Sequence, residues 1–207
     1  MMDIKTVLST CTPFLQRLEE LYGRMDREYN RIAGLYGFDC RGCTDNCCHT
    51  FFYNHTYLEY CFLIKGLAEL SDEKQKAVVD RAVAACAAMK REKTAGKKPR
   101  VLCPLNENGL CGMHGHRLMI CRLHGIPYDL HTPGRPPFRG SGCFMFEKKC
   151  GSAQYIVFDR TPFYLDLSEL ELEFRQATGL GGKFKMTIAE MVAGFGTGRA
   201  VTRGEAP

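Results

Sequence analysis

Four cysteines lie within nine residues of this chain, in the pattern Cys40-x-x-Cys43-x-x-x-Cys47-Cys48. A C-x-x-C pair places two sulfurs on one side of a tight turn, which is a unit that zinc sites and iron–sulfur sites both use. Cys47 and Cys48 are adjacent, and neighbouring side chains diverge in extended backbone. We therefore expect these two cysteines to face different metals, or different atoms of one cluster. A short segment of this kind rarely closes a complete site, so it requires ligands from elsewhere in the chain.

A second group of cysteines lies far along the chain and can supply those ligands. It consists of Cys103, Cys111 and Cys121, with Cys143 behind them and Cys150 as the alternative to Cys143. Eight thiolates suit two four-coordinate ions, or one cluster together with one ion. The predicted metal ligands are therefore eight cysteines: Cys40, Cys43, Cys47, Cys48, Cys103, Cys111, Cys121 and Cys143.

The other cysteines and the nearby histidines have different interpretations. Cys61 and Cys86 fall in helical apolar patterns and are expected to pack as small hydrophobic residues, whereas Cys11 stands alone near the N-terminus. Mixed Cys/His zinc sites exist, so a ligating histidine stays an alternative, but the surplus of cysteines favours a supporting or surface role. The histidines close to predicted ligands are His49, His114, His116 and His124.

Composition and charge limit the compartment and the partners. The chain has twelve cysteines in 207 residues, lacks the long apolar region of a secretory signal at its start, and has no apolar run long enough to cross a bilayer. We therefore expect a cytoplasmic protein without a membrane partner, whose thiols stay reduced. The formal charge of +5 counts thiols as neutral; eight thiolates would change it to −3, and two divalent ions would return it to +1. The charge therefore argues against a nucleic-acid partner. Arg117 and Arg122, beside Cys121, either donate to sulfur or form ordinary ion pairs.

Apolar periodicity and capping signals predict a mainly α-helical fold. Thr12 and Pro13 suit the start of a long amphipathic helix that should stop near Gly37. The capping box Thr56-Tyr57-Leu58-Glu59 predicts a helix to about Leu70, and Ser71 suits the cap of a further helix through about Glu92. The segment 96–99 then breaks the helix and forms a basic linker.

The second half of the chain is less regular. Residues 100–150 read as loop-rich, with 131–137 plainly loop, and we expect metal ligation to organise them. A short strand is expected at 155–158, and capping boxes that begin at Ser168 and at Thr187 predict two short helices. The predicted organisation is a helical cysteine-cluster domain over 1–150 with few or no strands, a short extension over 151–193 packed on it, and a disordered tail over 194–207.

The cysteine spacing resembles that of the YkgJ-type cysteine-cluster proteins, which are described as zinc- or iron-chelating and often labelled iron–sulfur oxidoreductases. Their pattern is C-x-x-C, a short gap and C-C, then Cys-Pro, and finally C-x-I-Y-x-x-R-P-x-x-C-R. Here it corresponds to the first cysteine group, to Cys103-Pro104 and to the stretch from Cys111 to Cys121-Arg122, and it spans about half of the chain. His114 replaces the family's aromatic residue and Leu118 its proline, so we expect a different loop geometry. The resemblance implies metal binding and adds little about a reaction.

Two functions compete. The first is an iron–sulfur protein that acts in electron transfer or as an accessory to a redox enzyme; the cysteine density favours it, and oxidoreductase-like activity stays open. The sequence has no flavin or nicotinamide motif, so an electron partner would be a separate protein. The alternative is a zinc protein with a structural or scaffolding role and no catalytic activity. A metallohydrolase fits less well, because thiolates would close the metal's coordination shell.

Overall fold

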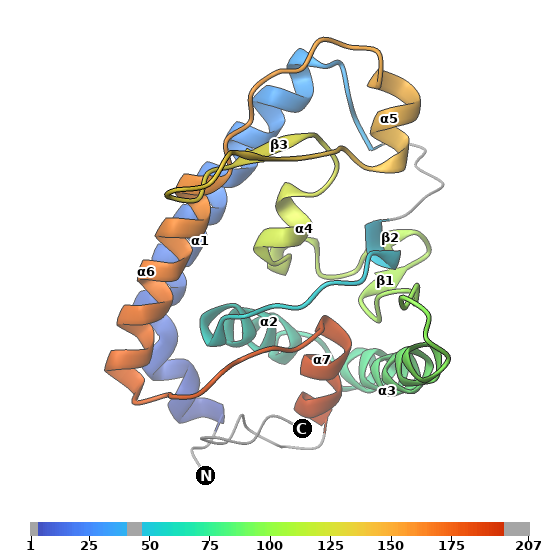
Figure 1. Ribbon diagram of the computed structural model, residues 1–207. Helices are drawn as coiled ribbons and strands as arrows, with labels where there is room; N and C mark the ends of the chain where they lie inside the picture. Colours follow the sequence, from blue (N-terminus) through green and yellow to red (C-terminus); the bar gives the residue numbers. More distant parts are fainter. Residues whose placement is uncertain (1–3, 41–46, 197–207) are drawn as a thin grey trace. The chain divides into compact units, whose positions relative to one another are not determined.

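The computed structural model (Figure 1) describes the backbone of residues 4–40 and 47–196 and the side chains of residues 11–40 and 48–196. Within these ranges the chain forms seven α-helices and two small antiparallel sheets of two strands each, which confirms the mainly α-helical fold with few strands. None of the described helices combines the length and apolar character needed to cross a membrane. The α-helices are α1 (Ile4–Leu35), α2 (Tyr57–Ala68), α3 (Asp72–Thr94), α4 (Met119–Leu123), α5 (Phe144–Cys150), α6 (Thr161–Thr178) and α7 (Ile188–Gly196). The strands are β1 (Asn106–Glu107), β2 (Leu110–Cys111), β3 (Tyr128–Leu130) and β4 (Phe138–Gly140), and the two short 3-10 helices are η1 (Cys47–His49) and η2 (His114–His116).

The chain divides into two compact units, each built from separated segments. Unit 1 comprises Met1–Leu15, Cys48–Arg117 and Glu171–Pro207, and unit 2 comprises Gln16–Cys47 and Leu118–Leu170. The helices α1 and α6 each contribute residues to both units. The predicted boundary near residue 150 stays a prediction. Most of the predicted tail, residues 197–207, lies outside the described part of the chain.

Helix α1 starts earlier than its capping signal predicts. It begins at Ile4, so Pro13 lies inside the helix, where it has no N–H to donate to the preceding turn. A threonine–proline pair marks a helix start only if the residues before it are not helical themselves, and here they are. The end is confirmed: α1 stops at Leu35, and Gly37 follows in the left-handed region at φ 62°.

Three predicted caps are confirmed. Thr56 accepts a hydrogen bond from the N–H of Glu59 at 3.3 Å, and its hydroxyl donates to the carboxylate of that residue at 2.8 Å. Ser71 accepts from an amide in the first turn of α3 at 3.5 Å, and Thr187 opens α7 with the same pattern as Thr56. These caps satisfy amides that the first turn of a helix leaves without partners. The break after α3 is also confirmed, with Gly96 at φ 70°.

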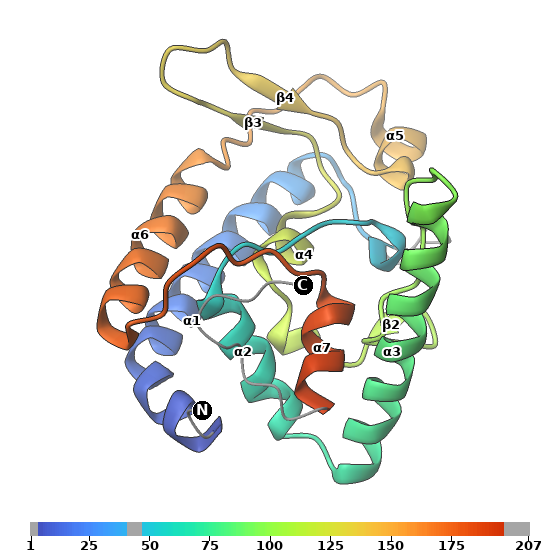
Figure 2. The same cartoon turned by 60° about the horizontal axis from the view of Figure 1, so that its bottom comes forward.

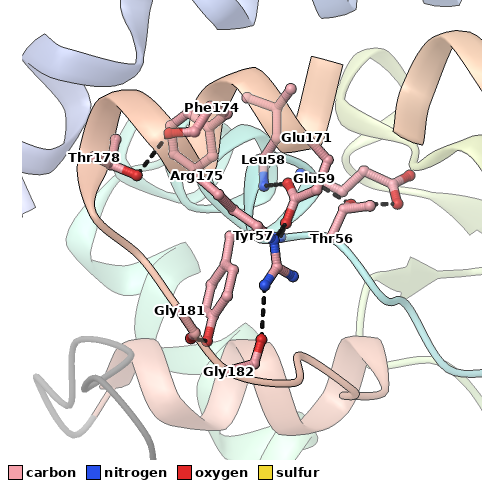
Figure 3. Close-up of polar contacts among 10 residues, drawn as sticks. All are labelled: Thr56, Tyr57, Leu58, Glu59, Glu171, Phe174, Arg175, Thr178, Gly181 and Gly182. Carbon is pink, nitrogen blue, oxygen red and sulfur yellow. Dashed lines mark hydrogen bonds and ion pairs between the residues drawn. The ribbon is translucent and has the colours of Figure 1, made fainter. Parts of the chain in front are cut away.

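The fourth predicted cap, at Ser168, is wrong, because that residue lies in the interior of α6. Its expected partner Glu171 caps a different helix (Figure 3). The Glu171 carboxylate accepts hydrogen bonds from the backbone N–H groups of Tyr57 and Leu58, both at 2.9 Å, and so caps α2 from α6. Arg175, one turn further along α6, donates to the same carboxylate at 2.6 Å.

In unit 1 the helices α3 and α7 lie side by side, as Figures 1 and 2 both show. Their contact is built from small and flexible side chains, which lets the two backbones approach closely. The buried residues of this contact are Ala85, Met89 and Ala189, and the partly buried residues packed against it are Phe51, Cys86 and Val101.

In unit 2 the strands β3 and β4 form a hairpin around the predicted 131–137 loop, with Asp129 opposite Arg139. The strand predicted at 155–158 is wrong. With β3 the segment makes only isolated contacts: the N–H of Asp129 donates to the carbonyl of Phe158 at 2.9 Å, and Asp159 makes one bridge. Its four consecutive apolar residues gave the strand signal, but they form no ladder with β3.

Candidate metal centre

Three predicted ligands lie near one another in unit 1: Cys48, Cys103 and Cys111. The N–H of Cys103 donates to the carbonyl of Cys48 at 2.9 Å, which holds η1 against the segment that precedes β1. The chain then turns back through the β1–β2 hairpin, where Asn106 lies opposite Cys111. The N–H of Gly112 closes this arrangement by donating to the carbonyl of Leu105 at 2.8 Å.

The turn of this hairpin explains how two cysteines eight positions apart come close. Asn108 and Gly109 form a two-residue turn, and both have positive φ, 53° and 87°. An Asn-Gly pair suits a turn that requires positive φ at both positions. Sequence reasoning missed this hairpin, although the Asn-Gly pair is a strong short-range signal for one.

Cys103 and Cys111 are each influenced by the backbone amide two residues further on. The amide of Leu105 lowers the pKa of the Cys103 thiol, and the amide of Met113 lowers the pKa of the Cys111 thiol. Amide hydrogen bonds to sulfur favour the thiolate over the thiol, and they tune the potential of sulfur-ligated iron. The repeated geometry suits two metal-binding thiolates.

The electrostatics of the three thiols show that they share one environment. Burial raises the pKa of the Cys103 thiol to about 12; the Leu105 amide opposes this shift, and the nearby Cys48 and Cys111 add to it. Burial is also the main cause of the raised pKa of Cys111. A bound cation would reverse this balance, because metals take cysteine as thiolate.

Arg81 fixes the segment between the two cysteines. Its guanidinium donates to the carbonyl of Pro104 at 2.8 Å and pairs with the Glu107 carboxylate at 3.0 Å. A side chain of α3 therefore holds both ends of β1, and the hairpin does not rest on its own few hydrogen bonds.

The other predicted ligands lie elsewhere. Cys40 is exposed after the end of α1, Cys121 lies within α4, and Cys143 is the N-cap of α5, where its sulfur accepts from the N–H of Phe146 at 3.4 Å. All three belong to unit 2. Cys43 and the side chain of Cys47 lie outside the described residues. Among the side chains at 11–40 and 48–196, no three from His, Cys, Asp and Glu are gathered into a ready metal-binding group.

The remaining cysteines have packing partners. Cys150 donates to the carbonyl of Tyr36 at 3.6 Å, and Cys86 packs beside the α3–α7 contact, as predicted. Cys61 is buried in α2, also as predicted. Cys11 is not isolated: it is fully buried, and its thiol is hydrogen-bonded to that of Cys61.

The histidines differ in their environments. Within the described part of the chain, His49 Nδ1 is buried and has no hydrogen-bond partner. An imidazole nitrogen is a ligand that zinc accepts beside thiolates, so His49 fits a metal-binding role better than the sequence indicates. His116 instead packs its ring on Phe62, with centroids 5.0 Å apart, and its Nε2 lies 3.7 Å from the Glu69 carboxylate.

Arg122 makes the ion pair that was one of its two predicted roles. It pairs with Asp26 of α1 at 2.5 Å, and its guanidinium lies 4.3 Å from the centroid of the Tyr22 ring. Arg122 therefore makes an ion pair within unit 2.

Comparisons of the chain with protein families, with curated protein sequences and with solved structures find no match. The resemblance to the YkgJ-type proteins therefore stays a prediction that rests on cysteine spacing.

Proposed function

We propose that this chain binds metal through cysteine thiolates, with Cys48, Cys103 and Cys111 as the core of the ligand set. The observation that carries the proposal is that three predicted ligands lie near one another in unit 1: the N–H of Cys103 donates to the carbonyl of Cys48, and the β1–β2 hairpin returns the chain to Cys111. Two backbone amides support it, because they favour the anionic sulfur that a metal requires. Thiolate ligands also require reduced cysteines, which fits a cytoplasmic protein.

The leading form of this proposal is an iron–sulfur cluster used in electron transfer or as a redox accessory. A cluster takes four cysteine ligands, so the eight predicted cysteines would serve one cluster and one ion: the three of the core, with Cys40, Cys43, Cys47, Cys121 and Cys143 as further ligands. Such a cluster supplies one-electron chemistry when bound. The chain's own contribution is to donate amide hydrogen bonds to the sulfurs and to bury Cys103, both of which shift the potential of sulfur-ligated iron.

The second candidate is a zinc site with a structural role, and His49 favours it. Its Nδ1 is buried without a hydrogen-bond partner among the described residues, and with Cys48, Cys103 and Cys111 it offers the donor types of a Cys₃His set, which zinc accepts. A structural zinc would then hold η1 against the hairpin, in a part of the chain with little regular secondary structure.

Purification under anaerobic conditions tests the proposal. Iron, acid-labile sulfide and zinc are quantified per chain, and the absorption spectrum is recorded. A brown protein that contains iron and sulfide and absorbs broadly near about 400 nm indicates a cluster. A colourless protein with stoichiometric zinc indicates the structural candidate, and a chain that holds neither metal refutes both.

Matched cysteine variants tie the metal to the site. Cys111→Ser should lower the metal content to less than about half, because serine is a poor ligand for zinc or iron at neutral pH. Cys86→Ser is the control, since Cys86 is also half-buried in unit 1 but packs beside the α3–α7 contact. Equal metal loss in the two variants would show that the metal is not held at the hairpin.

A further inference from the structure

The net charge of the chain is concentrated in one short segment. Residues 90–100 hold six basic residues and one acidic residue, a net charge of +5, which equals the formal charge of the whole chain. The remaining residues are therefore neutral in sum. All six basic side chains are exposed: Lys90, Arg91, Lys93, Lys97, Lys98 and Arg100.

A seventh basic residue joins them from a distant part of unit 1. Asn54 and Met186 exchange backbone hydrogen bonds of 2.8 and 3.1 Å, which places Lys185 beside Tyr53. Lys93 donates to the Tyr53 hydroxyl at 2.9 Å, and the ammonium groups of Lys93 and Lys185 lie 5.3 and 4.3 Å from the centre of the Tyr53 ring. Two like charges are thus held on one aromatic ring. These seven residues form what we call the basic surface.

At least four members of the basic surface are not neutralised by carboxylates within the described part of the chain. Of its members, Lys90, Arg91, Lys97 and Lys98 form no ion pair with any described carboxylate. The acidic residue within the segment, Glu92, accepts a hydrogen bond from a backbone N–H, that of Arg100, at 2.7 Å. The negative end of the α3 dipole explains basic residues in the last helical turn, but not those beyond Gly96 or on the 185–186 segment.

The basic surface lies next to the candidate metal centre in the same unit. Arg100 precedes the ligand Cys103 by three residues, a distance of at most about 11 Å along an extended chain. Val101 packs on the α3–α7 contact and so fixes the connecting segment on a rigid helix pair.

We propose that the basic surface docks a carboxylate-rich surface of a partner protein and brings that partner beside the metal centre. The docking stands on the charge arrangement, and only its role beside a metal rests on the proposed function. Complementary charge suits a transient, electrostatically steered contact of the kind that redox partners make. Single-stranded nucleic acid suits the surface less, because proteins that bind it offer aromatic faces to the bases. Here the Tyr53 ring carries two lysines, and Phe51 packs on the helix contact.

Binding to fluorescently labelled poly-L-glutamate tests the docking, with anisotropy measured as salt is raised from about 20 to 300 mM. The double variant Lys97→Glu with Lys98→Glu should weaken binding at low salt by at least about tenfold. The control, Lys74→Glu with Lys148→Glu, changes the net charge equally at two exposed sites outside the basic surface. It should weaken binding by less than about threefold. The neutral variant Lys97→Gln with Lys98→Gln should fall between wild type and the charge reversal, and circular dichroism checks that each variant is folded.

Three results would overturn the proposal. The first is that poly-L-glutamate does not bind wild type at low salt. The second is an equal loss of affinity in both charge-reversed proteins, which would show that only the net charge matters. The third is tenfold tighter binding of wild type to an oligothymidylate or to phosphatidylserine vesicles, which would make the partner a nucleic acid or a membrane. Metal content is measured on the same samples. A chain without metal refutes the proposed function but not the docking proposal. Full metal content without binding to poly-L-glutamate refutes only the docking proposal.

Discussion

Glu171 offers the sharpest test of how this fold is held together, because one side chain satisfies two buried amides of another helix. It is 6 % exposed, and its two carboxylate oxygens accept the N–H groups of Tyr57 and Leu58, both at 2.9 Å. These are the first two residues of α2, whose amides have no partner within the helix. Thr56 satisfies the third amide, that of Glu59.

The expected cost of removing this cap follows from the groups that it would leave unpaired. Each buried N–H without an acceptor costs about 1–3 kcal/mol, so the loss of both acceptors in Glu171→Ala should lower the free energy of unfolding by about 2–6 kcal/mol. The loss of unfolding free energy is limited at Arg175, because this residue keeps two other contacts in the variant. It donates to the carbonyl of Gly182 at 2.6 Å and lies on the Tyr57 ring. Glu171→Gln keeps one acceptor oxygen and should cost about 1–3 kcal/mol.

Urea unfolding followed by circular dichroism measures these losses, and amide hydrogen exchange locates them. Exchange at Tyr57 and Leu58 should accelerate in both Glu171 variants, because opening of the first turn of α2 no longer breaks a side-chain bond. Glu169→Ala is the control, since Glu169 is exposed on the same helix, and its effect should stay within about 0.5 kcal/mol. If Glu171→Ala lowers the free energy of unfolding no more than Glu169→Ala does, the Glu171 carboxylate does not stabilise the fold as a helix cap.

Two further predictions concern α2. Burial raises the pKa of Tyr60 to about 12, so its contribution to stability is complete below pH about 10 and is lost as pH rises from there to 12. Tyr60→Phe should flatten the fall of the unfolding free energy over this range by up to about 1.4 kcal/mol per pH unit, and parallel curves would contradict the burial argument. Gly66→Ala should destabilise by about 1–3 kcal/mol, because a Cβ there would collide with the His116 ring and force it off Phe62. Gly34→Ala meets no neighbour in α1 and should instead stabilise by up to about 1 kcal/mol in the same thermal unfolding assay.

Local signals were sufficient for much of the helical structure. Thr56, Ser71 and Thr187 mark helix starts correctly, because a cap is a contact between residues three apart and needs nothing from the rest of the chain. The same signal fails at Ser168, where the residues before it are already helical and Glu171 is used by another helix. A capping box therefore indicates a helix nearby but not whether the carboxylate stays local.

In the candidate site, too, local contacts could be predicted from the sequence and long-range contacts could not. The approach of Cys111 to Cys103 could be predicted, since the Asn108-Gly109 turn between them is a local signal. The contact of Cys48 with Cys103 could not, because it is a backbone hydrogen bond between residues 55 positions apart, which no spacing rule encodes. Cysteine spacing identifies the residue types for a metal, whereas the amide groups that point at the sulfurs depend on the folded turns.

Ligand number separates the two proposed functions more directly than metal identity alone. A zinc held by Cys48, Cys103, Cys111 and His49 would need nothing from unit 2, so Cys121→Ser and Cys143→Ser would leave about one zinc per chain. An eight-thiolate set predicts the opposite, with iron and sulfide falling by about half or more in each variant. His49→Ala has the opposite effect on the two proposed sites. It should release the zinc of a four-ligand site, whereas a cluster held only by thiolates would keep its iron. The zinc proposal is excluded if zinc is lost from the Cys121 or Cys143 variant while the His49 variant retains it.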